Sequence, residues 1–367
     1  MKKIGIIIGC FFCVMLLGIF LINVNRKETD VTKQSTKVGF VMNGSCEDHS
    51  WGQSHFEAME MTAKELNLEV MYRENVPGDE TAVLVMEELI DQGCEIIICN
   101  SVQYDEWILK VAEKHPDIYF FHAAGTESMD NVSTYFGRIY QMRYLSGIVA
   151  GLQTKTNQIG YVAAFPISEV NRGINAFTLG VRSVNPEAVV YVQWCDSWTD
   201  EQMAAEATNA LLDTYDIDVL TLHCDVLTPL EVADQRGIWT IGYNMDTASV
   251  FPDSYLTASV WRWENFYTPH ILECLQGKFI GKEYWEGIEN GIVDLAPLTS
   301  HAEAGVAQVV EAEKERLQSG TFDVFYGPIY DREGVLRVAE GETMSDQTLL
   351  NEFDWYVEGV VIYDENQ

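Results

Sequence analysis

From residue 37 onward, short apolar runs with the composition of β-strands alternate with longer stretches of helical period. Residues 37–42 form the first such run, residues 54–66 carry apolar side chains on one helical face, and residues 68–72 form a second run. A strand, a helix and a strand in this order predict a βαβ unit with parallel strands. The alternation continues to residue 122, so we expect a first lobe built on a doubly wound parallel sheet.

A second series of the same kind follows a helical stretch at residues 140–154. Its expected strands are residues 158–163, 189–194, 219–223, 239–243 and 255–260, and its expected helices are residues 172–184, 200–215 and 230–236. The chain has 367 residues, which suits two domains of about 150 residues after an N-terminal segment. We therefore predict two Rossmann-like α/β lobes joined by a hinge, with the following bounds: an anchor at 1–24, a tether at 25–36, a first lobe at 37–156 plus about 263–295, and a second lobe at 157–262 plus about 296–367.

The N-terminus has the pattern of a membrane segment. Lys2 and Lys3 precede residues 4–22, which contain no charged residue, and Arg26 follows. At about 1.5 Å per residue this run nearly spans the hydrocarbon core of a bilayer. A cleaved signal peptide is the alternative, but no small-residue cleavage site follows the run. We expect an uncleaved transmembrane helix that holds an extracytoplasmic protein at the cell membrane.

Composition and motifs exclude several classes of protein. The formal net charge of −33 opposes binding to a phosphate backbone, so we expect no nucleic-acid partner. The phosphate-binding, zinc-protease and nucleophile-elbow motifs are absent from the sequence, and no enzyme activity or cofactor is expected. Six cysteines follow the anchor, and their spacing predicts neither a disulfide pairing nor a metal site: Cys46, Cys94, Cys99, Cys195, Cys224 and Cys274.

The loops after the strands are the expected binding site, because ligands of open α/β sheets collect beyond the carboxyl ends of the strands. The loop after the first strand contains Asp48 and Trp51, and a similar loop in the second lobe contains Trp198. Asp48 could instead cap the following helix, and Trp51 could pack against the hinge. If each lobe contributes an indole, the two can sandwich a flat ring.

Polar residues at other strand ends add candidate contacts to the edge of that ring. Amides and carboxylates suit the mixed donors and acceptors of a purine. An aromatic residue such as Trp261 at a strand end is as often part of the core or hinge as a ligand contact. The predicted ligand-binding residues are Asp48, Trp51, Ser101, Trp198, Asp225, Asn244, Asp246 and Trp261.

Several stretches resemble the basic membrane protein family of substrate-binding lipoproteins, the purine-nucleoside-receptor group of the type I periplasmic-binding fold. They are residues 48–58, 144–151, 159–162, 174–181, 241–246 and 353–360. The resemblance implies that Asp48, Trp51 and Trp198 hold a base, with Asn244 and Asp246 as further contacts. The sequence departs from the family in having Trp at both stacking positions, Asn244 where an acid is common, and Trp261 with Arg262 about where a ligand-binding Lys stands. These departures leave room for a free nucleobase.

Together these features predict a monomeric solute-binding protein of an ABC importer. It would capture a purine nucleobase or nucleoside between its lobes by hinge closure and present it to a membrane permease. The alternative is a membrane-anchored sensing module that reports its ligand to a signalling partner. An enzyme acting on nucleosides is the least favoured reading.

Overall fold

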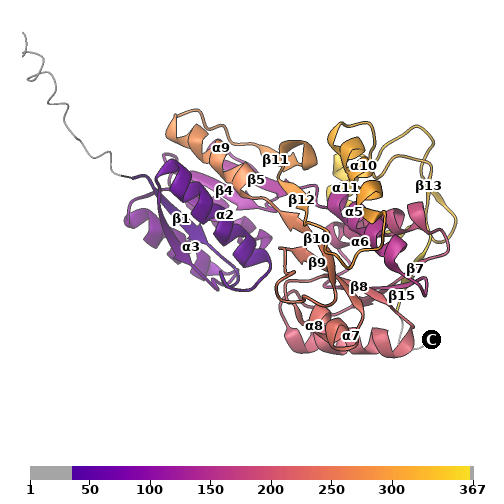
Figure 1. Cartoon of the computed structure of the whole chain (residues 1–367). Helices are drawn as coiled ribbons and strands as arrows, with labels where there is room; N and C mark the ends of the chain where they lie inside the picture. Colours follow the sequence, from indigo (N-terminus) through magenta and orange to yellow (C-terminus); the bar gives the residue numbers. More distant parts are fainter. Residues whose placement is uncertain (1–34, 364–367) are drawn as a thin grey trace, which may run out of the picture. The chain divides into compact units, whose positions relative to one another are not determined.

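The computed structural model describes residues 35–363 and shows two large sheets, each flanked by helices, and one sheet of two short strands (Figure 1). The predicted anchor, and the predicted tether up to residue 34, lie outside the described residues. None of the helices within residues 35–363 has the length and apolar character that crossing a membrane requires.

The first lobe contains a six-stranded sheet in the order β11-β5-β4-β3-β1-β2. Every neighbouring pair of strands in it is parallel. The most distant member in sequence, β11, pairs with β5 and is orange in Figure 1 beside that purple strand. The strands are β1 (Lys37–Val41), β2 (Glu69–Arg73), β3 (Cys94–Cys99), β4 (Tyr119–Ala123), β5 (Val132–Gly137) and β11 (Glu283–Glu286).

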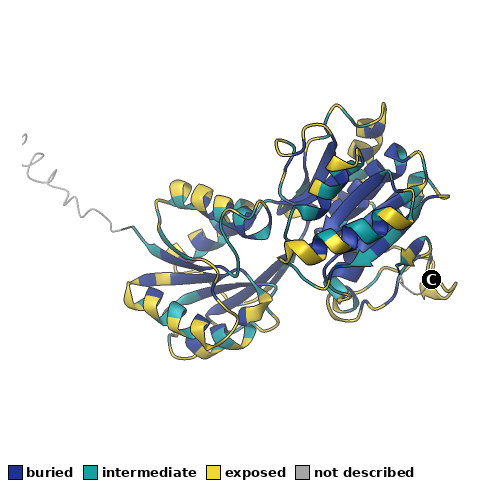
Figure 2. Cartoon of the chain, turned by 90° about the horizontal axis from the view of Figure 1, so that it is seen from below, coloured by how far each residue is buried: buried dark blue, intermediate teal, exposed yellow. Residues whose placement is uncertain are grey.

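Helices cover both faces of this sheet. Helices α2 (Trp51–Leu66) and α9 (Glu264–Leu275) pack against each other, and α3 (Glu80–Asp91) packs against α4 (Asp105–Ala112). The strands between them are mostly buried, whereas the outer faces of the helices are exposed (Figure 2). This is the doubly wound arrangement that the alternation of apolar periods predicts.

The second lobe contains a seven-stranded sheet in the order β12-β10-β9-β8-β6-β7-β15. All neighbouring pairs are parallel except β10 with β12, which is antiparallel. The predicted α/β architecture with two parallel-sheet lobes is therefore confirmed. The strands are β6 (Gln158–Ala163), β7 (Val189–Trp194), β8 (Val219–His223), β9 (Trp239–Asn244), β10 (Tyr255–Trp261), β12 (Val293–Leu295) and β15 (Val360–Ile362).

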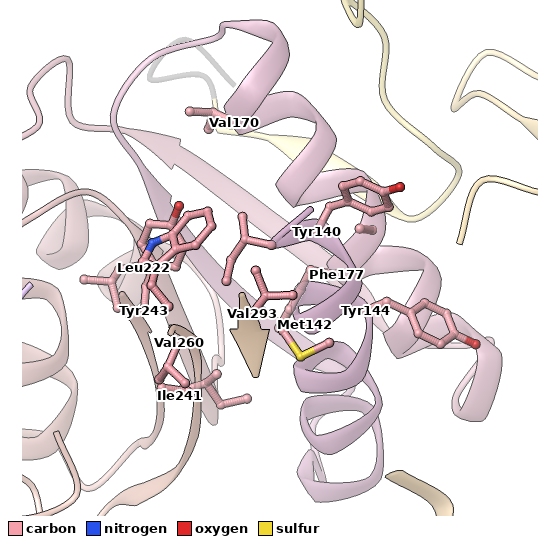
Figure 3. Packing of buried hydrophobic residues seen from close by; sticks show 14 of the residues in the cluster. Tyr140, Met142, Tyr144, Val170, Phe177, Leu222, Ile241, Tyr243, Val260 and Val293 are labelled. Carbon is pink, nitrogen blue, oxygen red and sulfur yellow. The ribbon is translucent and has the colours of Figure 1, made fainter. Parts of the chain in front are cut away.

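Two pairs of helices flank the second sheet. Helix α5 (Tyr140–Gln153) packs on α6 (Ser168–Val184), and α7 (Glu201–Thr214) packs on α8 (Thr228–Gln235). Buried side chains of α5 and α6, including Met142 and Phe177, face strand residues such as Ile241 (Figure 3). A packed apolar core of this kind holds the strand ends in fixed positions.

Glycines allow α5 and α6 to approach each other closely. A Cβ atom on Gly147 would collide with the carbonyl oxygen of Phe177, and one on Gly180 would collide with that of Tyr144. Both clashes involve backbone atoms, which cannot rotate away as a side chain can. The contact between these helices therefore requires glycine at both positions.

The C-terminal segment wraps back onto the second lobe. It contains α10 (Val306–Gln318), β13 (Ile329–Tyr330), β14 (Leu336–Val338) and α11 (Asp346–Asn351), and it ends in β15 beside β7. The amide of Asn171 donates to the carbonyl of Phe353 at 2.8 Å, and that of Asn175 donates to the carbonyl of Trp355 at 2.7 Å. These buried amides on α6 fasten the segment to the lobe.

The lobe boundaries expected near residues 156, 262 and 295 stay a proposal. Strand β12, which ends at the expected boundary near residue 295, pairs within the second sheet. Helix α5, which precedes the expected boundary near residue 156, packs on α6 of the second lobe.

Candidate functional site

A cavity of about 120 Å³ lies where the carboxyl ends of strands from both sheets come together. We call it the interlobe cavity. The first lobe lines it with Asn43, Trp51, Asn100, Ser101, Val102, Ala124 and Phe136, and the second with Ile167, Glu169, Trp198, Asp225, Tyr243 and Asn244. Five of the eight predicted ligand-binding residues are in this set: Trp51, Ser101, Trp198, Asp225 and Asn244.

Trp51 begins helix α2, and hydrogen bonding and packing fix its position. Its indole nitrogen donates to the carbonyl oxygen of Asn100 at 2.8 Å. The edges of neighbouring rings contact it, with Trp261 at 5.8 Å and Trp263 at 5.6 Å between ring centroids. An indole held in this way presents a preformed aromatic wall to the cavity.

Trp198 lines the same cavity from the loop between β7 and α7. Its ring makes edge contacts with Phe165 at 6.0 Å and His223 at 6.2 Å. Its carbonyl oxygen accepts a hydrogen bond of 2.7 Å from the backbone of Asp225. The structure thus brings one tryptophan from each lobe to one cavity, and stacking of a ligand between them remains a prediction.

Asn244, the last residue of β9, connects the two lobes. Its amide nitrogen donates to the Ser50 hydroxyl at 2.9 Å and to the Asp225 carboxylate at 2.8 Å, and its oxygen accepts from the Trp261 indole at 2.9 Å. Its φ of +68° lies in the left-handed region, which asparagine tolerates better than most residues. Asn244 is 1% exposed and Ser50 is 2% exposed, so the bond between them is shielded from solvent.

Asp225 is an acid in an unfavourable environment for charge. Burial, and next the negative charge of Asp48, raise the pKa of Asp225 to about 8, while the hydrogen bond from Asn244 acts in the opposite direction. At neutral pH its carboxyl group is therefore mostly protonated and can donate a hydrogen bond into the cavity.

Asp48 lies outside the interlobe cavity and caps helix α2. Its carboxylate accepts hydrogen bonds from the backbone of Ser50 at 2.8 Å, Gly52 at 2.7 Å and Gln53 at 2.9 Å. These bonds satisfy donors at the start of the helix that would otherwise lack partners. The observed contacts of Asp48 are therefore those of a helix cap. A contact between Asp48 and a ligand stays a prediction.

The other predicted residues occupy different surroundings. Asp246 is exposed and accepts a hydrogen bond from the backbone of Ala248. Trp261 lies behind the cavity wall, 4% exposed and stacked on Trp263 at 4.4 Å. Ser101 lines the cavity, and its hydroxyl accepts from the backbone of Gln103 at 3.4 Å.

The predicted set omits Asn43, Phe136, Glu169 and Tyr243, all of which line the cavity. Glu169 stands in the first turn of α6, and burial raises its pKa although the nearby Arg172 opposes that rise. The loop before α6, residues 164–167, contains one aromatic residue, Phe165, and no acidic residue, so its sequence does not resemble the loops that contain Trp51 and Trp198. Only the position of α6 beside the strand ends brings Glu169 to the cavity.

A larger cavity of about 530 Å³ adjoins the first and shares Ala124, Phe136 and Glu169 with it. Arg172 of α6 and Trp285 of β11 are among its other lining residues. A ligand bound in the interlobe cavity therefore has room for a substituent on this side.

Neither a disulfide nor a candidate metal-binding cluster occurs within residues 35–363. The six cysteines of this part of the chain are free, and burial raises the pKa of the Cys94 thiol to about 11. What the interlobe cavity offers is aromatic surface, amides and protonatable acids, which suit reversible binding of a small molecule.

Comparison with known proteins identifies relatives of the whole globular part. The family described as ABC transporter substrate-binding protein, PnrA-like, matches residues 35–321. A purine-binding protein of Brucella abortus (strain 2308) is 35% identical over 89% of this chain and 93% of its own length. A protein of Haloferax volcanii named as an ABC transporter glucose-binding protein is 36% identical over 85% of this chain and 77% of its own length.

Solved structures share the fold. An ABC transporter solute-binding protein from Conexibacter woesei DSM 14684 superimposes with a TM-score of 0.68 at 23% identity, covering 79% of this chain and 98% of that one. At this identity the likeness concerns the arrangement of lobes and sheets.

Proposed function

We propose, for a chain that belongs to the PnrA-like family of ABC transporter substrate-binding proteins, that the interlobe cavity captures a purine nucleobase or nucleoside. The family binds small molecules outside the cytoplasm and delivers them to a membrane permease. The ligand itself is our inference from the cavity.

The observation that carries the proposal is the pair of indoles, Trp51 and Trp198, that line one cavity from opposite lobes. Aromatic rings bind flat heterocycles by stacking, and this interaction is strongest when water is excluded from both faces. Closure of the two lobes on a ligand would exclude that water.

The charges of the cavity favour a neutral ligand. Of the residues that line it, Asp225 and Glu169 are acidic, and this lining includes neither Lys nor Arg. A phosphate group placed in this lining would have no cation there to pair with, because Arg172 lines the adjoining cavity instead. An uncharged base fits this lining better than a phosphate group does, and the adjoining cavity has room for a sugar.

The named relatives point to two ligand classes. The Brucella abortus relative is described as purine-binding, which supports the proposal, whereas the Haloferax volcanii relative is described as glucose-binding. A sugar is therefore the competing ligand. Two indoles at one cavity favour the flat ring.

We further propose that residues 4–22 hold the protein at the membrane, so that the lobes work beside the permease. A protein that functions in this way needs no catalytic group.

Calorimetric titration of residues 35–367 with adenine, adenosine, guanine, guanosine, AMP and glucose tests the proposal. We expect binding of at least one base or nucleoside and much weaker binding of AMP and glucose. Trp198→Ala should weaken that binding by roughly tenfold or more, and Trp198→Phe, which keeps an aromatic face, should weaken it less. Binding of glucose alone would refute the purine assignment.

A further inference from the structure

Asn100 lines the interlobe cavity, and one of its polar groups has no hydrogen-bond partner among the described residues. It follows strand β3 and is 0% exposed. Its backbone N–H donates to the carbonyl of Val41 at 3.1 Å, and its carbonyl accepts from the Trp51 indole at 2.8 Å. Its side-chain oxygen accepts from the backbone N–H of Asn43 at 3.0 Å. Among the described residues, nothing accepts a hydrogen bond from its side-chain nitrogen.

These contacts also fix which way the Asn100 amide points. An isolated asparagine can exchange its oxygen and nitrogen by rotation, so its orientation is often ambiguous. Here the Asn43 N–H is a donor, and only the oxygen of Asn100 can accept from it. The group that remains for the cavity is therefore the NH₂ group.

A buried donor without a partner is unfavourable unless something else fills that role. The neighbouring Asn43 contributes a second unpartnered atom at the cavity, its side-chain oxygen. The cavity wall thus offers a donor of fixed orientation beside the Asn43 side-chain amide, which no hydrogen bond within the described part of the chain holds and which can turn its oxygen toward a ligand.

We propose that Asn100 determines ligand specificity by donating a hydrogen bond to an acceptor on the edge of the bound ring, with Asn43 accepting from an adjacent donor. The inference rests on the proposed function and narrows it to heterocycles that carry an acceptor next to an N–H or amino group. Rings that are alkylated or protonated at this acceptor are excluded.

Asn100→Asp is the sharpest variant, because its carboxylate can still accept from the Asn43 N–H while the donor to the cavity is lost. Asn265→Asp makes the same chemical change on the exposed surface of α9, where the Asn265 amide bonds only the Gly291 carbonyl. Melting curves of both variants show whether each remains folded.

The test measures the affinity of each variant for the purine that binds wild-type protein most tightly. It then uses analogues of that purine in which N1, N3 or N7 is replaced by C–H, or O6 by hydrogen. We expect one analogue to bind wild-type protein at least about tenfold more weakly than its parent, because the Asn100 donor is then unpaired. In Asn100→Asp that difference should disappear, and in Asn265→Asp it should persist.

Comparing the parent and its analogue within each variant separates the loss of the donor from the added negative charge, which affects both ligands. If every analogue bound wild-type protein as tightly as the parent, or if the difference survived in Asn100→Asp, the role of Asn100 would be refuted. The purine assignment would still stand if Trp198→Ala weakened binding. If wild-type protein bound no purine, both proposals would fall.

Discussion

The amide of Asn244 donates a hydrogen bond of 2.9 Å to the hydroxyl of Ser50, which joins the end of a strand in the second lobe to the residue before the first helix of the first lobe. Both residues are buried. A bond between the lobes exists only while they are together, so it stabilises that arrangement relative to a separated one.

Ser50→Ala removes this bond and leaves the Asn244 amide bonded to Asp225. We expect a loss of about 0.5–1.5 kcal/mol in the stability of the closed arrangement, which corresponds to a several-fold weaker affinity for adenine or adenosine in calorimetry. Thr214→Ala removes a hydroxyl that bonds within α7 and is the matched control. Equal affinities in the two variants would show that the bond does not contribute to closure.

The raised pKa of Asp225 predicts a dependence of stability on pH. The folded protein keeps this proton up to about pH 8, whereas the unfolded chain releases it near the ordinary value of 3.8. Between these values the folded state binds more protons, so the free energy of unfolding should fall as pH rises. Because a single proton is involved, the free energy of unfolding can change by at most about 1.4 kcal/mol per pH unit. The partial exposure of Asp225 makes this change smaller.

Urea unfolding of wild-type protein and Asp225→Asn at several pH values from 5 to 8.5 measures this slope. The variant mimics the protonated acid, and its stability should decline less over that range. Glu169, whose pKa burial also raises, contributes a residual slope of the same sign in both proteins. Two parallel profiles would contradict the assignment to Asp225.

The contact between α5 and α6 predicts that Gly180→Ala destabilises the second lobe. The added methyl group meets the carbonyl oxygen of Tyr144, and separating the helices should cost about 1–3 kcal/mol. Ser183→Ala lies one turn further along α6 and removes a hydroxyl that bonds the Gly180 carbonyl, without adding an atom between the helices. Thermal unfolding should show a markedly larger decrease for Gly180→Ala, and similar decreases would mean that the helices can adjust.

The attachment of the C-terminal segment depends on Asn175. Its amide donates to the Trp355 carbonyl at 2.7 Å, and its oxygen accepts from the Val357 backbone at 2.9 Å. Because Asn175→Ala leaves both backbone groups without this partner, we expect a cost of about 1–3 kcal/mol and faster proteolysis after residue 340. The exposed Asn265→Ala should change little, and equal protease sensitivity would show that other contacts hold the segment.

The alternation of apolar periods was enough to predict both lobes, because the twofold and 3.6-fold periods are local properties of a chain that buries one face of each element. Predicted strands at residues 158–163, 189–194 and 219–223 coincide with β6, β7 and β8. Among the strands of the two large sheets, β5, β11, β12 and β15 were not predicted. The last two are short, and β11 is a strand only because it pairs with β5 about 150 residues earlier.

In the binding site too, some features could be predicted from the sequence and others depend on the tertiary structure. The sequence alone placed Trp51 and Trp198 in loops at strand ends, since parallel sheets direct those loops to one edge. Tertiary structure decided which polar groups remain free to bind: Asp48 is occupied by the start of α2, and Asn244 by its bonds to Ser50, Asp225 and Trp261. Whether a polar side chain has a donor or acceptor left for a ligand depends on hydrogen-bond partners that are distant in sequence. A local sequence pattern cannot predict those partners.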